Sequence, residues 1–429
     1  MLCIFGNLKI EDFQVEAEEL QAMRESKQRK NWGVQSHQKK TILPSLKARN
    51  NLRTKANNLQ TKMDTINAKI KSKEYNYQIF VGSSILNEMA EFIRKNHPGK
   101  KVAVIMGENT SRLHKPKLSK ILGDLNPLFI TVPSGESSKS RQMKEEIEDN
   151  LLDHKFGRDS LIIAIGGGVI GDLAGFVAST FNRGIPIIHV PTTLLAMADS
   201  SIGGKTAINT KHGKNLVGTT YQPNAVFADM DFLQTLSGDE LKNGLAEVIK
   251  MSIIMDENLF ELLEKNHKKI LAGDKDTLQQ IIKRNIELKV QVVEKDAEEK
   301  GLRQILNFGH TFGHALEALH NYNIRHGFGV VQGMIVESKI SVMADNLSEN
   351  EEEKIKDIIK LFGFPTTIGN DVKSSKIIEI MKSDKKSRGN KPRFVLIDKI
   401  GKVKSKGSNF SFEVETDVIE EAIEECKAK

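Results

Sequence analysis

The segment LIIAIGGGVIGDLAGF, residues 161–176, constrains the fold of this chain more than any other. An apolar run that ends in three glycines and continues as a helix-forming stretch is typical of a strand–turn–helix unit in a parallel sheet. Gly166, Gly168 and Gly171 satisfy the G-x-G-x-x-G pattern, in which backbone N–H groups can approach a pyrophosphate. Glycines also make ordinary tight turns, and the stretch Ile188–Pro191 offers no acidic residue for a ribose. The pattern therefore predicts a nucleotide-binding turn that departs from the ordinary dinucleotide fingerprint.

Further short apolar runs alternate with helical stretches around this turn. The predicted strands are Tyr77–Val81, Lys101–Met106, Leu128–Val132, Ser160–Ile165, Pro186–Val190 and Val226–Met230. Between two of them, Ser140–His154 carries apolar residues on one helical face. Strands that are apolar throughout and separated by helices predict a parallel sheet covered on both faces.

After about residue 234 the strand-like runs largely stop. Helical spacing of apolar residues covers Leu241–Glu264, Asp276–Lys295, Thr311–His320, Val330–Ala344 and Glu351–Leu361. A late pair of short runs, Arg393–Ile397 and Phe410–Val414, predicts a small hairpin. Since 429 residues exceed one ordinary core, we expect an α/β domain over 63–236 and a mostly helical domain over 237–429.

The net charge of +7 belongs almost entirely to the first 62 residues. They hold twelve Lys and Arg against six acidic residues, so the other 367 residues carry only +1. We interpret residues 1–62 as a basic, disordered extension, the alternative being a basic arm for RNA or DNA. The near-neutral remainder argues against nucleic acid as the main partner.

Compartment and redox context follow from what the sequence lacks. No run is long and apolar enough to span a membrane, and the first residues do not resemble a secretory signal. The two cysteines, Cys3 and Cys426, lie near opposite ends and predict neither a disulfide framework nor a thiolate metal cluster. We therefore expect a cytoplasmic protein.

Small and polar residues are dense between residues 189 and 223. Because loops beyond the carboxyl ends of parallel strands form the usual ligand crevice, we expect a phosphate- or carboxylate-binding loop here. The alternative is a long solvated loop. The side chains that favour binding are those of Thr192, Thr193, Asp199, Lys205, Lys214 and Asn215.

One carboxylate and several imidazoles follow in the helical half. Glu247 and Lys250 are three residues apart on one predicted helix, and His310 and His314 are four apart on another, with His326 beyond them. This set suits zinc or a similar divalent ion. The spacing alone predicts that both His310 and His314 bind the metal, whereas the alternative is a pair of structural histidines.

Nine ordered strings between Gly166 and Gly327 make the chain resemble the 3-dehydroquinate synthase family. They are GGGVIGDLAGF, RGIP, PTTLLA, DSSIGGKT, GKNLVG, YQP, GLAEVIK, LRQILNFGHTFGHALE and HG. The resemblance, which extends from about Tyr75 to the C-terminus, implies a Rossmann-like N-terminal domain, a helical metal-binding C-terminal domain and a site in the cleft. It implies NAD and one divalent ion (Zn or Co) as cofactors.

The resemblance also assigns roles residue by residue. It makes Glu247, His310 and His326 the metal ligands and His314 a catalytic helper near the substrate phosphate. The other matching catalytic positions are Asp199, Lys205 and Lys250. The implied substrate contacts are Arg183, Asn215, Lys289, Arg303, Asn307 and either Lys385 or Lys386. The implied NAD contacts are Glu136, Lys139, Gly167, Gly168, Val169, Thr192, Thr193, Lys214, Phe232 and Thr235.

The implied reaction converts 3-deoxy-D-arabino-heptulosonate 7-phosphate to 3-dehydroquinate and phosphate, in a homodimer where Arg183 reaches the neighbouring subunit. It makes the chain an NAD- and metal-dependent phosphate lyase of the shikimate pathway. Two positions depart from the family: Phe328 stands where a Glu is usual, and Gly107 stands where Asp or Asn is frequent near the adenosine ribose.

Three other functions compete with this interpretation. Another sugar-phosphate cyclase, of the inosose or valiolone synthase type, would act on a substrate without a carboxylate, and the presence of Lys289, Arg303 and Asn307 argues against it. A metal-dependent alcohol dehydrogenase would produce NADH in net amounts. A non-catalytic nucleotide- or nucleic-acid-binding protein would not need Glu247 with its two histidines.

Overall fold

The computed structural model describes residues 75–383 and 391–428. The chain divides into two units, Met1–Lys73 and Glu74–Lys429, and the description below concerns the second. The extension predicted over 1–62 lies outside the described residues, as do Lys385 and Lys386.

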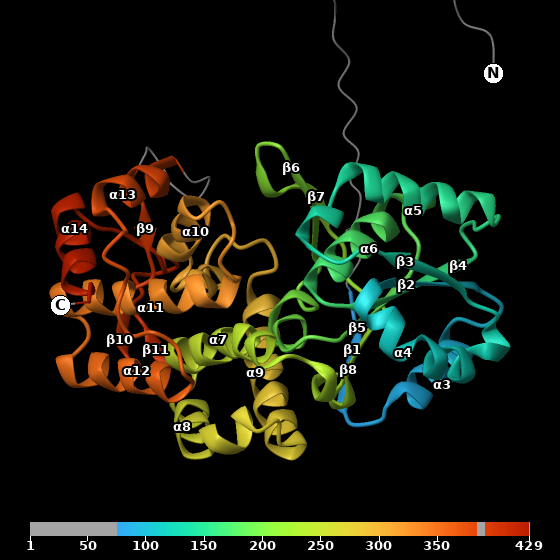
Figure 1. Cartoon of the computed structure of the whole chain (residues 1–429), viewed down its shortest axis with the longest axis horizontal. Helices are drawn as coiled ribbons and strands as arrows, with labels where there is room; N and C mark the ends of the chain where they lie inside the picture. The colour runs from blue at the N-terminus through green and yellow to red at the C-terminus, as the bar shows by residue number, and fades with distance from the viewer. Residues whose placement is uncertain (1–74, 384–390, 429) are drawn as a thin grey trace, which may run out of the picture. The chain divides into compact units, whose positions relative to one another are not determined.

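A six-stranded parallel sheet forms the N-terminal part of the described chain (Figure 1). Its spatial order is β1-β8-β5-β4-β2-β3, and every neighbouring pair is parallel. The strands are β1 (Gln78–Gly82), β2 (Lys101–Gly107), β3 (Leu128–Val132), β4 (Ser160–Gly166), β5 (Ile187–Pro191) and β8 (Ala225–Asp229). All six predicted strands are confirmed to within one residue at each end, because uninterrupted apolar runs leave little choice of boundary.

Helices cover both faces of this sheet and bury alternate residues of each strand. On β4, Leu161 and Ile163 belong to a core shared with α3 (Leu86–Asn96) and α4 (Glu108–Ile121). Ile162 and Ala164 belong to the opposite core. That second core includes residues of α5 (Arg141–Asp153) and α6 (Gly168–Thr180). The α/β architecture predicted for this half is therefore confirmed.

His189 of β5 is a buried titratable group in this layer, only 5% exposed. Burial lowers its pKa from 6.5 to about 4, so the folded state keeps the imidazole neutral. Between these two values the unfolded chain binds more protons, and stability is lost as pH falls. We expect the unfolding free energy of both wild type and His189→Leu to change between about pH 7.5 and about pH 5. The drop should be about 2 kcal/mol larger in wild type than in His189→Leu. Urea titrations at both pH values measure this, with the exposed His154→Gln as control; equal drops in wild type and His189→Leu would contradict it.

The polar segment after β5 differs from the loop expected there. Ala196–Ser200 forms one π-helical turn, η4, and β6 (Lys205–Thr210) pairs antiparallel with β7 (Gly213–Thr220). The hairpin packs on α6, where a Cβ on Gly175 would lie 2.4 Å from Cγ2 of Thr206. The β-branched residues in TAINT and LVGTT are the strand signal that the density of glycines obscured.

The C-terminal part is mostly helical, as predicted (Figure 1). The predicted helix Leu241–Glu264 is two helices, because Asp256 is extended (φ −151°) and caps the second by accepting hydrogen bonds from the N–H groups of Asn258 and Leu259. Helix α11 begins at His326, four residues before the predicted Val330. The helices are α7 (Gly238–Met255), α8 (Glu257–Leu271), α9 (Lys275–Lys295), α10 (His310–Leu319), α11 (His326–Met343), α12 (Glu349–Leu361), α13 (Ser374–Ser383) and α14 (Thr416–Glu425).

The two late runs pair antiparallel, but they do not form a simple hairpin. β9 (Arg393–Phe394) pairs with β12 (Phe412–Glu413), while β10 (Ile397–Lys399) and β11 (Lys402–Val403) pair with each other in between.

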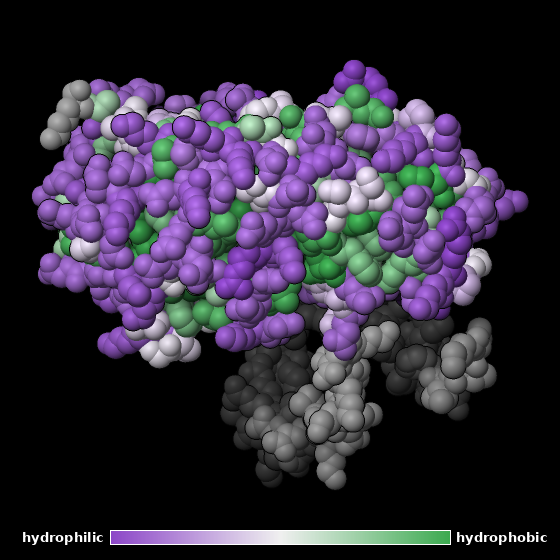
Figure 2. Space-filling model, turned by 90° about the horizontal axis from the view of Figure 1, so that it is seen from below, coloured by the Kyte–Doolittle hydropathy of each residue, from purple (hydrophilic) through white to green (hydrophobic). Residues whose placement is uncertain are grey.

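No helix within 75–383 and 391–428 is long and apolar enough to cross a bilayer. The face seen in Figure 2 is mainly hydrophilic, with smaller apolar areas between the polar residues, as on most folded proteins.

Candidate functional site

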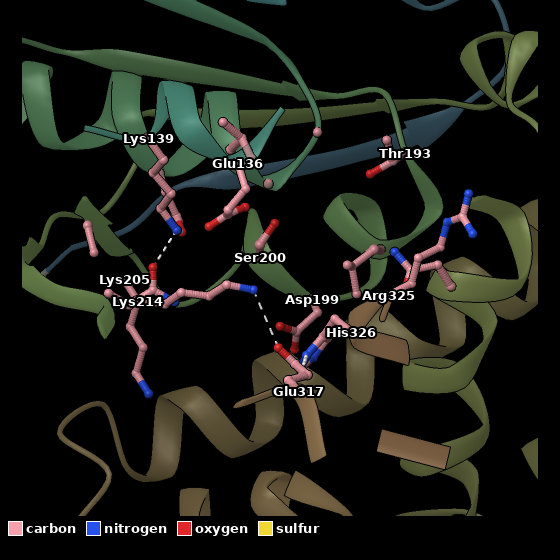
Figure 3. A pocket seen from close by; sticks show the side chains of 18 of the residues that line it. Glu136, Lys139, Thr193, Asp199, Ser200, Lys205, Lys214, Glu317, Arg325 and His326 are labelled. Carbon is pink, nitrogen blue, oxygen red and sulfur yellow. Dashed lines mark hydrogen bonds and ion pairs between the residues drawn. The ribbon is translucent and has the colours of Figure 1, made fainter. Parts of the chain in front are cut away.

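A cleft of about 2050 Å³ lies between the carboxyl ends of the sheet strands and the helical part (Figure 3). Its walls include the ends of β2, β4 and β5 and residues of α7, α9, α10 and α11. Small-molecule pockets usually measure about 300–1,000 Å³, so this cleft has room for a dinucleotide and a second ligand together.

The glycine turn between β4 and α6 packs closely against neighbouring side chains, which leaves little room for a Cβ. A Cβ on Gly166 would lie 2.6 Å from Ile170, and a Cβ on Gly168 would lie 3.2 Å from Oγ of Ser200. Helix α6 starts at Gly168 without a side-chain cap, so N–H groups of its first turn remain for a ligand. A pyrophosphate fits this turn and the positive end of the helix dipole.

Glu247, His310 and His326 converge from three helices on one point. Nε2 of His310 lies 3.6 Å and Nε2 of His326 3.5 Å from the same oxygen, Oε1 of Glu247. That oxygen is buried and, within the described residues, accepts no hydrogen bond. One carboxylate oxygen and two imidazole nitrogens facing a common point form a donor set that fits Zn²⁺ or Co²⁺.

The charges around Glu247 favour its ionised form. Burial alone would raise the pKa of Glu247, but the ammonium of Lys250 and the ring of His326 hold it well below its usual range. Nζ of Lys250 donates to Oε2 of Glu247 at 2.5 Å and to the carbonyl of Leu306 at 2.8 Å. Lys250 is 1% exposed, so the pair is fixed in place, while Oε1 of Glu247, which faces the two histidines, stays available.

Glu317 on α10 is a second carboxylate beside the candidate metal-binding set of Glu247, His310 and His326, and the sequence reasoning missed it. Its Oε1 lies 2.8 Å from Nδ1 of His326, the ring nitrogen opposite the one that faces Glu247. Nζ of Lys214 lies 3.5 Å from its Oε2, an approach visible in Figure 3. Burial opposes protonation of His326, but the two carboxylates raise the pKa of this imidazole to about 9. Glu317 thus fixes the orientation of the His326 ring.

His314 lies beside Glu247, His310 and His326 but does not belong to that donor set. Its ring centroid is 5.2 Å from that of His310 and 5.9 Å from that of His326. It forms a second possible donor set only together with Glu317 and His326. The spacing-based expectation that His310 and His314 share a metal therefore has less geometric support than the set Glu247, His310 and His326.

A buried cation faces Asp199 from α9. Nζ of Lys289 donates to Oδ1 of Asp199 at 2.5 Å and also to its backbone carbonyl. Burial opposes the charge of Asp199, but Lys289 holds the pKa of this carboxyl below its usual value. The Asp199 side chain remains 36% exposed to the cleft, so a ligand can still reach the pair.

Arg303 and Gly203 form a close contact near the same wall. Arg303 is 3% exposed and donates from Nη1 to the carbonyl of Ala297 at 2.9 Å. Gly203 has φ +94°, and a Cβ there would lie 2.5 Å from Nη2 of Arg303. Only glycine fits this position, which explains one of the glycines in DSSIGGKT.

Glu299 is another residue that the sequence reasoning missed. Its Oε2 pairs with Nζ of Lys205 and its Oε1 accepts from Nδ2 of Asn307 at 3.0 Å. It therefore links two of the predicted site residues across the cleft.

A similar contact joins the sheet to the hairpin. Nζ of Lys139, 4% exposed, donates to Asp172 of α6 and to Oδ1 of Asn215. Glu136 accepts from Nδ2 of Asn209 at 2.7 Å. Asp172, within the glycine string, was not among the predicted residues, although it lies one turn after the glycines on the cleft side.

Most residues predicted for the site line this cleft. Glu247 does not line it, but its Oε1 lies 3.6 Å and 3.5 Å from Nε2 of His310 and His326, which do. Arg183 does not line the cleft either: it lies in η3 (Phe181–Arg183) and is exposed. The predicted residues that line the cleft are Glu136, Lys139, Gly167, Gly168, Val169, Thr192, Thr193, Asp199, Lys205, Lys214, Asn215, Phe232, Thr235, Lys250, Lys289, Arg303, Asn307, His310, His314 and His326.

Comparisons with known proteins show the family to which this chain is similar. Residues 129–243 match the family model described as 3-dehydroquinate synthase N-terminal, and residues 244–387 match the one described as 3-dehydroquinate synthase C-terminal. A 3-dehydroquinate synthase from Thermodesulfovibrio yellowstonii is 43% identical over 78% of this chain and 94% of its own length. One from Desulforamulus reducens is 40% identical over 80% of this chain and 95% of its own length.

Solved structures of similar fold hold the two expected cofactors. A 2-deoxy-scyllo-inosose synthase complexed with carbaglucose-6-phosphate, NAD⁺ and Co²⁺ has a TM-score of 0.75 and 27% identity, covering 81% of this chain and 96% of that one. A 2-epi-5-epi-valiolone synthase from Streptomyces hygroscopicus with NAD⁺ and Zn²⁺ has a TM-score of 0.74 at 24% identity, covering 84% of this chain and 99% of that one. The second comparison supports the fold alone.

Proposed function

This chain belongs to the 3-dehydroquinate synthase family, and we propose that it converts 3-deoxy-D-arabino-heptulosonate 7-phosphate to 3-dehydroquinate and phosphate. The observation that carries this proposal is the convergence of Glu247, His310 and His326 in a cleft whose other wall is the glycine turn. Relatives of that name are about 40% identical over most of the chain, whereas the inosose synthase is 27% identical. A sugar-phosphate cyclase of another type is therefore the weaker candidate.

The cofactors that fit are NAD at the glycine turn and one divalent ion, Zn²⁺ or Co²⁺, at Glu247, His310 and His326. When bound, NAD would supply a transient oxidation that acidifies a neighbouring C–H, and the ion would polarise the alcohol that is oxidised. Since NAD is regenerated in each cycle, we expect no net NADH.

The chain's own residues account for binding and orientation of a substrate with two anionic ends. Lys289 and Arg303 are buried cations that line the cleft and are suited to a carboxylate, and Lys205 and Asn215 line it from the hairpin and are suited to a phosphate. Holding both ends fixes the reacting carbons near Asp199 and Lys250, which lowers the entropic part of the barrier. We propose that His314 exchanges a proton with the substrate; its ring centroid lies 5.2 Å from that of His310, which supports this role.

The proposal also includes the assembly and the setting. We place the enzyme in the shikimate pathway of aromatic amino acid biosynthesis in the cytoplasm, as a homodimer. The exposed position of Arg183 outside the cleft supports a role in the site of a neighbouring subunit.

One assay tests the function. Purified full-length protein is incubated with the heptulosonate phosphate, NAD⁺ and Zn²⁺ or Co²⁺, and phosphate, dehydroquinate and NADH are followed. We expect phosphate and dehydroquinate in equal amounts without NADH accumulation. Absence of phosphate release, steady NADH formation, or faster turnover of a hexose 6-phosphate would each overturn the proposal.

Glu317 gives a graded prediction for the metal site. Because its carboxylate orients His326 through Nδ1, Glu317→Gln should weaken metal affinity by about 10–100-fold while leaving the three ligands in place. Competition with a chelating dye measures the affinity, and excess metal should restore most of the activity. The control is Glu264→Gln, an exposed glutamate on α8. Unchanged affinity in Glu317→Gln would contradict the orienting role.

A further inference from the structure

The cleft continues past the glycine turn to an apolar end between α4 and η5 (Met230–Thr235). There the ring of His114 lies 4.8 Å from that of Phe232, edge to face, and Nε2 of His114 lies 3.4 Å from Oγ1 of Thr235. Leu113 lines the same end and is 47% exposed. Flat aromatic and aliphatic surfaces of this kind suit a nucleobase. If the glycine turn holds the pyrophosphate and the nicotinamide faces the metal ligands, as in the proposed function, the adenine lies here.

The adenosine ribose then lies above Gly107, where β2 ends beside β4. In ordinary NAD sites an acidic side chain at such a strand end accepts the ribose hydroxyls. The fold does not require glycine at this position. Its φ is −70°, and an added Cβ would make ordinary contacts of 3.5 and 3.7 Å with Ile170. The lack of a carboxylate at Gly107 is therefore a property of this sequence and not a steric necessity.

A cation lies where the acid is missing. Arg112 is exposed, lines the cleft and is in the second turn of α4, whose first residue follows Gly107. Across residues 75–383 and 391–428 it has neither an ion pair nor a hydrogen bond. Side chains on a helix incline toward its N-terminus, so Arg112 leans toward the ribose position. The first turn of α4 has no side-chain cap, which adds N–H donors for an anion.

The neighbouring acids are directed elsewhere. Glu136, which follows β3, accepts a hydrogen bond from Asn209 of the hairpin. Asp231 pairs with Lys275 and Lys117. Glu108 is exposed and is not among the residues that line the cleft.

We infer that Gly107 and Arg112 admit a 2′-phosphate on the adenosine ribose, so that the site binds NADP⁺ as well as NAD⁺. This inference rests on the proposed function for the placement of the dinucleotide. A guanidinium can bind a phosphate through two parallel hydrogen bonds, and no carboxylate at Gly107 repels that phosphate.

Calorimetric titration of the nucleotide-free full-length protein with NAD⁺ and with NADP⁺ tests the inference. We expect the Kd of NADP⁺ to lie within about tenfold of that of NAD⁺, whereas a site with an acid at the ribose rejects the phosphate more strongly. Arg112→Gln should raise the Kd of NADP⁺ by about tenfold or more and that of NAD⁺ by less than about threefold. Gly107→Asp should also raise the Kd of NADP⁺ by about tenfold or more without weakening NAD⁺.

The matched control is Lys117→Gln, an exposed cation on the same helix that pairs with Asp231. It should leave both dissociation constants unchanged, and retained NAD⁺ binding shows that a variant is folded. A wild-type Kd for NADP⁺ more than about tenfold above that for NAD⁺, or equal weakening of both nucleotides by Arg112→Gln, overturns the inference. Phosphate release with NAD⁺ alone tests the proposed function separately, so failure of one does not imply failure of the other.

Discussion

Glu247→Gln is expected to remove both the bound metal and the activity. The substitution keeps the size of the side chain but replaces a buried anion, the only carboxylate in the set with His310 and His326, by a neutral amide. A metal ion contributes several kcal/mol to a reaction of this type, so we expect phosphate release to fall on the order of a thousandfold. Elemental analysis of the purified variant should find less than one ion per chain, and phosphate release measures the activity.

Melting temperatures and a control variant separate loss of the metal from misfolding. Lys250 loses its anionic partner in Glu247→Gln, so the variant should also melt at a lower temperature than wild type. The matched control is Glu264→Gln, an exposed residue on α8, which should bind metal and turn over like wild type. If Glu247→Gln retained both its ion and its activity, other residues would hold the metal.

The sequence predicts the fold well where the signal is local. Apolar runs such as Ser160–Ile165 define strands because a parallel strand buried on both faces favours apolar side chains at most of its positions. For the segment of the hairpin β6–β7 the sequence predicts a ligand-binding loop, because small and polar residues are dense there. Its strand pairing is accompanied by contacts with α6, which are not local in sequence. At Asp256 one helix ends and the next is capped, although the helical spacing of apolar residues continues without interruption. Only the backbone geometry shows this break.

The site shows the same division between local and long-range information. The spacing of His310 and His314 predicts a shared metal, but which histidines face Glu247 depends on how α7, α10 and α11 cross. The resemblance to the family identifies His326 as the second histidine beside Glu247. The sequence spacing between His310 and His326 does not predict this, because a loop separates the two helices on which they lie. Glu317 could have been found from the sequence, since it lies seven residues after His310 on the same helical face. Glu299 could not, because its contacts with Lys205 and Asn307 bring a loop to the hairpin.

Lys289→Met is expected to lower both stability and substrate affinity, and a double variant separates the two effects. The substitution leaves Asp199 without its cation. Removing one member of a buried pair costs about 3–5 kcal/mol, but Asp199 is 36% exposed, so we expect about 2 kcal/mol and a melting temperature several degrees lower. Loss of the cation from the substrate site should lower kcat/KM by about a hundredfold, mainly through KM.

The double variant Lys289→Met/Asp199→Asn removes both charges, so most of the lost stability should return. Activity should not return, because neither charge is then available to the substrate. The control is Lys283→Met, an exposed lysine on the same helix, α9, which should change neither property. Melting curves and initial rates of phosphate release measure both effects. If Lys289→Met lost stability but kept the wild-type KM, Lys289 would serve only to hold Asp199 in place; recovery of activity in the double variant would exclude both residues from substrate binding.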